Sequence, residues 1–221
     1  MRFTVLLQPE ASSSMRASAL CIDADRCNQC LRCLGACPTQ AIRLRDGRPE
    51  SMRHLCVDCT ACMEVCPRGV FGLDAPEALP EASEEAVLAL PAALLGQFGA
   101  NVPRAAVESA LTSIGWQKVF FSHPWETAIA TAAQRHAEAA GPGVLMAPVC
   151  PAVLNLIQLR YPSLLPRVAP FLTAIEAMCG ALGGDPLVVV APCAAQLSLA
   201  RLPQGLRRIE IVRPDALIRA L

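Results

Sequence analysis

The fold of the N-terminal part of the chain is decided by the segment CNQCLRCLGACP, residues 27–38. A second segment, CVDCTACMEVCP at residues 56–67, repeats the same spacing 29 positions later. In each segment three cysteines stand two residues apart, a fourth follows after three residues, and a proline comes next. Such a loop turns three thiolates toward one cubane, while the fourth cysteine points away along the next segment. The duplicated pattern predicts two 4Fe-4S clusters held by eight cysteines.

The fourth cysteine of each segment is expected to serve the other cluster. Each cluster then takes three thiolates from one segment and one from the other. Cluster 1 is expected on Cys27, Cys30, Cys33 and Cys66, and cluster 2 on Cys56, Cys59, Cys62 and Cys37. The sequence Asp46-Gly47 between the segments predicts a hairpin turn.

Zinc is the alternative metal, because cysteine pairs two residues apart also make tetrahedral zinc sites. Zinc would need only four cysteines in two pairs, whereas the chain repeats a triple, a remote fourth cysteine and a trailing proline. Iron and sulfide explain this pattern better.

These cysteine segments closely resemble the bacterial two-cluster ferredoxins over about Ser18 to Ala75. The resemblance implies an α+β module of pseudo-twofold symmetry, with two short hairpins and two helical turns. Cys21 lies outside both segments in an apolar stretch that predicts the module's first strand. A free cysteine commonly packs as a small buried hydrophobe, so we expect Cys21 in the core.

The composition indicates which compartment and which classes of partner to expect. The 221 residues include 19 basic and 19 acidic side chains, so the formal charge is zero and favours neither nucleic acid nor an anionic membrane surface. The longest apolar run, residues 144–159, contains two prolines and is shorter than the roughly 18 uninterrupted apolar residues of a membrane helix. The stretch Met1 to Pro9 is too short for a signal peptide core. We therefore expect a cytoplasmic protein without a transmembrane segment.

The sequence predicts a ferredoxin domain over residues 1–75, a linker over 76–86 and an α/β domain over 87–221. Apolar strand-like runs and helical patterns alternate in the last part, which is typical of a mainly parallel sheet. The expected strands are residues 86–90, 118–121, 144–147, 187–191 and 209–212, and the expected helices 103–114, 125–140, 152–161 and 171–182, before a terminal helix.

Cys150 and Cys193 each follow an expected strand, and ligand sites in parallel sheets lie beyond the carboxyl ends of the strands. Around these cysteines the chain resembles the catalytic domain of the iron-only hydrogenases and their sensory relatives, over about residues 87–212. In that family the two matching cysteines bind the cubane that carries the catalytic di-iron unit. The α/β domain would then be one lobe of that catalytic domain.

The departures from the hydrogenase pattern change the expected function. Val149 takes the place of the family's proton-transfer cysteine, and Gln196 that of a lysine that contacts the di-iron ligands. The third cluster-binding loop would come after Leu221. Two thiolates cannot hold a cubane that needs four, and Cys179 lies in an expected helix where a packed residue fits better. We expect two clusters rather than three, with a cluster at Cys150 and Cys193 shared with another chain left open.

The expected function is electron transfer. The ferredoxin module would pass electrons to or from a redox protein, or within a larger oxidoreductase complex of anaerobic metabolism, docked through the degenerate hydrogenase-like lobe. The chain alone is not expected to be catalytic. The alternative is a regulatory redox sensor of the sensory hydrogenase-like type, whose output would lie on a partner.

Overall fold

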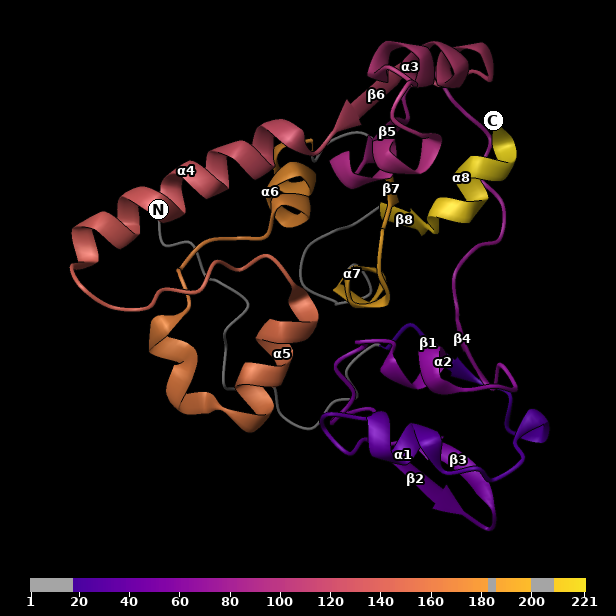
Figure 1. The fold of residues 1–221 in the computed structure, drawn as a ribbon. Helices are drawn as coiled ribbons and strands as arrows, with labels where there is room; N and C mark the ends of the chain where they lie inside the picture. The colour runs from indigo at the N-terminus through magenta and orange to yellow at the C-terminus, as the bar shows by residue number, and fades with distance from the viewer. Residues whose placement is uncertain (1–17, 183–185, 200–208) are drawn as a thin grey trace.

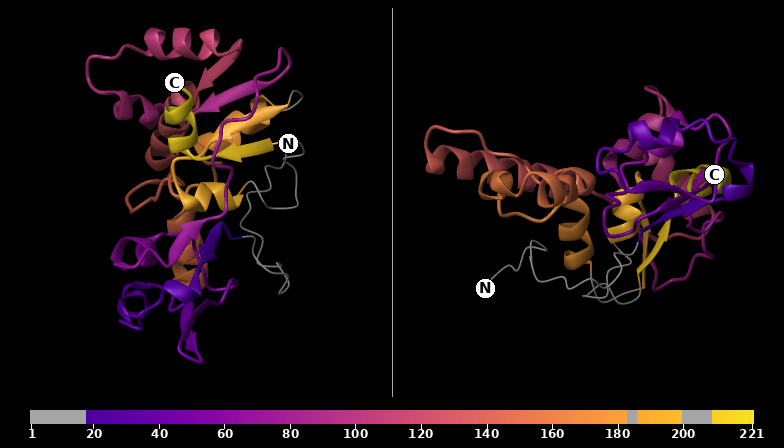
Figure 2. Two further views of the ribbon diagram at one scale, coloured as in Figure 1. Left: turned by 90° about the vertical axis from the view of Figure 1, so that its right-hand side faces the viewer. Right: turned by 90° about the horizontal axis from the view of Figure 1, so that it is seen from below.

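The computed structural model describes residues 18–182, 186–199 and 209–221. The stretch Met1 to Pro9, for which no signal peptide is expected, lies outside the described residues. The described chain forms a small module (residues 18–75) and a larger α/β domain, with helix α7 (Ala194–Leu199) between the module and the sheet in both Figure 1 and the left view of Figure 2.

The small module has two antiparallel strand pairs and two short helices. Strands β2 (Ile42–Arg45) and β3 (Arg48–Ser51) form the predicted hairpin, and Asp46 and Gly47 both have positive φ angles, as that turn requires. The second expected hairpin is wrong: β1 (Leu20–Ile22) pairs with β4 (Phe71–Leu73), so the two ends of the module close the fold. Helices α1 (Arg32–Ala36) and α2 (Ala61–Val65) pack on each other, and η1 (Ala24–Arg26) follows β1.

The α/β domain is built on a four-stranded parallel sheet in the order β6-β5-β7-β8. The strands are β5 (Val87–Leu90), β6 (Lys118–Phe121), β7 (Leu187–Val190) and β8 (Ile209–Val212). Strands β5 and β7 are buried along their whole length, as continuously apolar strands covered on both faces should be.

Helices cover both faces of this sheet. One face packs against η2 (Ala92–Phe98), α3 (Arg104–Ser113) and α8 (Pro214–Ala220) through a core that includes Leu111 and the buried Trp116. The other face packs against α6 (Ala174–Ala181), and α4 (His123–Ala140) packs beside α6. Thr173 and Glu176 form a capping box that fixes the start of α6.

One predicted strand is absent from the sheet. Residues 144–147 make only an isolated bridge between Met146 and Val168, and Val144 is 74% exposed. The glycines and proline of 141–143 precede this segment and Pro148 follows it, so only a short piece is free to pair, and it pairs with the chain after η3 (Pro162–Arg167). Cys150 therefore follows a loop and not a sheet strand.

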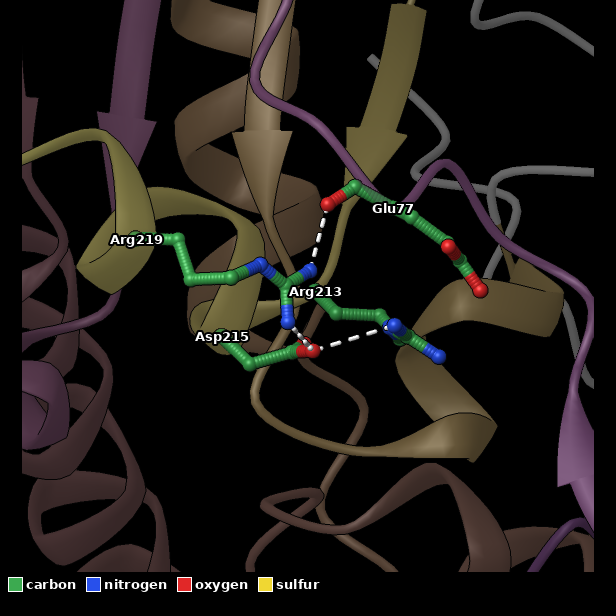
Figure 3. Close-up of polar contacts among 4 residues, drawn as sticks. All are labelled: Glu77, Arg213, Asp215 and Arg219. Atoms are coloured by element: carbon green, nitrogen blue, oxygen red, sulfur yellow. Dashed lines mark hydrogen bonds and ion pairs between the residues drawn. The ribbon is translucent and has the colours of Figure 1, made fainter.

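The linker between the module and the sheet packs against the α/β domain. Leu79 and Ala82 contact its core, and the Arg219 guanidinium of α8 donates to the backbone carbonyl of Glu77 (Figure 3). Asp215 accepts hydrogen bonds from Arg219 at 2.9 Å and from Arg213 at 3.0 Å, which holds the Arg219 side chain in place. These contacts fix the linker to the C-terminal helix.

Within the described ranges, none of the helices has both the length and the apolar character needed to span a membrane.

Candidate metal centre

The eight cysteines of the two segments surround two hollows in the small module. The first hollow is lined by three thiols of the first segment and one of the second: Cys27, Cys30, Cys33 and Cys66. The second hollow is lined by Cys37, Cys56, Cys59 and Cys62. Each hollow thus combines three cysteines of one segment with the fourth cysteine of the other.

The loops around the hollows use left-handed backbone at matched positions. Gln29 and Asp58 have φ angles of 58° and 52°, and Leu31 and Thr60 have φ angles of 62° and 63°. Non-glycine residues seldom adopt these angles, and such strained conformations concentrate at functional sites. The same unusual winding in both repeats turns successive cysteines toward one centre.

Backbone N–H groups point at the sulfur atoms, which suits a thiolate ligand set. Ala41 donates to Cys37 Sγ at 3.2 Å, and Val70, at the matching position of the second repeat, donates to Cys66 Sγ at 3.4 Å. Gln29 donates to Cys27 Sγ at 3.3 Å. Hydrogen bonds of this kind stabilise the charged sulfur and tune the potential of a bound cluster.

The thiol pKa values show how burial and hydrogen bonding compete at these sulfurs. Burial raises the pKa of Cys62 to about 12, and the neighbouring Cys56 and Cys59 thiolates add to the shift. Burial also raises the pKa of Cys33 and of Cys56. For Cys37, burial acts in the same direction, but hydrogen bonds from Thr39 and the backbone outweigh it and lower the pKa. Clustered thiolates of this kind need a strongly positive group at their centre.

The arrangement of the thiols bears on the choice between zinc and a cluster. Each hollow is lined by four thiols, three from one segment and the fourth from the other. This is the ligand arrangement of a two-cluster 4Fe-4S module.

The match with known proteins agrees with this geometry. Residues 26–71 match the 4Fe-4S dicluster domain family. This part of the chain is a ferredoxin module. The match supports 4Fe-4S binding, and it covers the hairpin, both helices and all eight cysteines of the two segments.

Three curated relatives are similar to the same part of the chain. A ferredoxin from Pyrobaculum islandicum is 40% identical over 62 residues, an iron-sulfur protein from Rhodospirillum rubrum is 41% identical over 48 residues, and the indolepyruvate oxidoreductase subunit IorA from Methanothermobacter marburgensis is 32% identical over 61 residues. These matches cover 28%, 21% and 28% of this chain. The chain spans 57%, 25% and 10% of the respective relatives.

The cysteines outside the two segments occupy different surroundings. Cys179 is buried in α6, as expected for a packed residue, but the expectation for Cys21 is wrong, because its side chain is exposed on edge strand β1. Cys150 is the N-cap of α5 (Pro151–Arg160), and Cys193 directly precedes α7. Both of these residues are exposed to solvent.

Cys150 and Cys193 lie near each other at the carboxyl edge of the sheet. Although Cys193 is exposed as a residue, partial burial of its thiol raises the pKa, and the Cys150 thiolate and the Asp58 carboxylate raise the pKa further. The structure therefore brings the two loops together, although the predicted strand before Cys150 does not form. Cys193 directly precedes Ala194 of α7, which helps to line the second hollow.

Sequence reasoning missed two hydrogen bonds here, one within the small module and one that joins the module to α7. Ser18 donates to Asp58 Oδ1 at 2.6 Å, and the backbone N–H of Ala19 donates to Ser198 Oγ of α7 at 2.9 Å. A comparison of the two cysteine segments could have drawn attention to Asp58, because the matching residue of the first segment is the neutral Gln29.

Proposed function

We propose that this chain is an electron-transfer protein, or the electron-transfer subunit of a cytoplasmic oxidoreductase complex, that carries two 4Fe-4S clusters. Cluster 1 would take the thiolates of Cys27, Cys30, Cys33 and Cys66, and cluster 2 those of Cys37, Cys56, Cys59 and Cys62. The observation that carries this proposal is the lining of the two hollows, each with three cysteines of one segment and the fourth of the other. When bound, each cluster supplies one-electron redox chemistry.

The two domains are proposed to form one electron path. The second hollow lies against α7, and α7 packs on α5 at the carboxyl edge of the sheet, where parallel sheets place their ligand sites. Cluster 2 would therefore face the α/β domain. The first hollow is lined by residues of the small module, so cluster 1 would face an external redox protein.

The α/β domain is proposed to be a hydrogenase-like lobe that docks the redox partner. Exposed apolar side chains of α5 and of the segments around it, namely Val149, Val153, Tyr161 and Leu164, support docking next to Cys150 and Cys193. One relative is named as a subunit of an oxidoreductase, which supports assembly into a larger complex.

Metal and sulfide analysis of protein purified without oxygen tests the proposal. We expect about eight irons and eight acid-labile sulfides per chain, and two interacting S = 1/2 signals in the electron paramagnetic resonance (EPR) spectrum of the reduced protein. Zinc in place of iron, or about four irons per chain, would contradict two clusters.

The roles of Cys150 and Cys193 are tested by replacing both with Ala. Two thiolates do not complete a cubane, so the double variant should keep the iron content and the reduced spectrum of the parent protein. If it loses about four irons, these cysteines bind a third cluster, completed by Cys179 or by another chain. Cys179→Ala in the parent protein distinguishes those two sources, because it removes those irons only if Cys179 is a ligand.

A further inference from the structure

The two cluster sites differ at one matched position. Gln29 and Asp58 are the third residues of their segments, 29 positions apart, and share a left-handed backbone conformation. Gln29 is exposed, whereas Asp58 is only 8% exposed. The repeat therefore places a neutral amide in water beside cluster 1 and a carboxylate in the protein interior beside cluster 2.

The surroundings of Asp58 hold its carboxylate close to the cluster 2 ligands. Its Oδ1 accepts the 2.6 Å hydrogen bond from Ser18, and the same oxygen lies 3.7 Å from Cys56 Sγ. Asp58 also lines the second hollow together with Ala194 of α7. The side chain is fixed by Ser18 on one side and faces the α/β domain on the other, so it does not turn out into solvent.

The other charged residues of the two segments also make the first site more positive than the second, but their side chains are exposed. The first segment carries Arg32, and the second carries Glu64 in addition to Asp58. Water and salt screen Arg32 and Glu64, which lie at the surface, far more than they screen a buried group. Asp58 is thus the charge that most strongly distinguishes the two sites.

We propose that Asp58 gives cluster 2 a lower reduction potential than cluster 1, so that cluster 1 is reduced first. Reduction adds one negative charge to a cluster, and a nearby buried carboxylate makes that addition less favourable. An electron that reaches cluster 2 from the α/β domain then moves on to cluster 1, from which an external partner takes it. This inference rests on the proposed function, since it requires two clusters.

The test is a redox titration of the iron-loaded full chain, followed by EPR spectroscopy, for the parent protein and for Asp58→Asn. Asparagine keeps an acceptor for Ser18 and tolerates the left-handed backbone, so mainly the charge changes. We expect the lower of the two potentials to rise while the upper one stays in place. The expected change in electron distribution between the clusters is about tenfold, which corresponds to about 59 mV for a one-electron couple.

Two control variants separate this effect from general perturbation. Gln29→Asn changes the matched position without a charge, and Asp46→Asn removes an exposed carboxylate from the hairpin turn; neither should move the lower potential. Asp58→Ser serves as a second neutral variant if Asp58→Asn does not load iron. Unchanged potentials in a fully loaded Asp58 variant, or an equal rise of both, would overturn the role of Asp58. Such a result would leave the two-cluster function intact, because iron and sulfide content test that function separately.

Discussion

At the scale of single residues, the cysteines are distinguished by what surrounds their sulfur atoms. The eight cysteines of the repeated segments face two hollows, and backbone N–H groups donate to several of their sulfurs. Cys21 lies on an exposed edge of the same module and has neither feature among the described contacts. Cys37 and Cys66 differ from the other six cysteines because each lines the hollow whose other three cysteines belong to the opposite segment.

Replacing Cys37 or Cys66 with Ala should therefore damage the whole module. Each substitution removes one of four thiolates from a cubane and a connection between two halves whose shared apolar core is small. We expect iron content to fall by half or more, with loss of the module's protection in hydrogen exchange.

Cys21→Ala is the matched control for this experiment. Its side chain is exposed, so the substitution should change stability by about 0.5 kcal/mol or less and leave the iron content unchanged. Iron loss equal to that of Cys37→Ala would mean that Cys21 is a ligand and that the ligand assignment is wrong.

At the scale of elements, the β2–β3 hairpin supports the loop of cluster 1. Gly47 occupies the turn with a φ angle of 76°, and a Cβ atom built there would lie 2.7 Å from Nε2 of Gln29. The turn thus approaches the end of the flexible, exposed Gln29 side chain, which a Cβ would displace. Glycine is favoured here mainly by the positive φ angle.

Gly47→Ala should weaken cluster 1 more than cluster 2. The substitution strains the turn, at a cost of about 1 kcal/mol or more, and displaces the Gln29 side chain that lines the first hollow. We expect about half of the iron to be lost to a chelator faster than in the parent protein, followed by a slower second phase.

Gly35→Ala provides the comparison for the hairpin variant. Gly35 lies in α1 with open space around a built Cβ, and alanine favours helix, so iron release should not accelerate. Uniform acceleration of both phases in Gly47→Ala would show that the hairpin supports the entire module and not one loop.

At the scale of the whole molecule, the two domains meet through small contacts while their cores remain separate. Ala19, Ala191 and Leu197 form a small apolar cluster at the junction, beside the hydrogen bond from Ala19 to Ser198. The α/β domain has its own extensive core on both faces of the sheet. The small module has few buried apolar residues, so we expect its stability to depend on the bound clusters.

Removal of iron should consequently unfold the small module and leave the α/β domain folded. Limited proteolysis and hydrogen exchange of the chelated full chain measure this outcome. We expect cleavage and loss of protection within residues 18–75, with protection retained in β5 and β7. Simultaneous loss of protection in both parts would show that the junction couples them into one cooperative unit.

The sequence alone determined the features that depend on local spacing. The cysteine positions predicted two ligand groups, Asp46-Gly47 predicted the hairpin, and the continuously apolar run of β7 predicted a strand buried on both faces. These features depend on neighbours close in the chain or on a motif with its own chemistry.

Only the tertiary structure decided how distant segments meet. It left residues 144–147 outside the sheet, because short stretches between glycines and prolines take whichever partner the surrounding fold offers. It exposed Cys21, because β1 forms an edge of the module. It buried Asp58 beside the second group of cysteines, because α7 docks there from about 140 residues further along the chain. Burial and charge proximity depend on such long-range packing, and the spacing of residues in one sequence does not encode them.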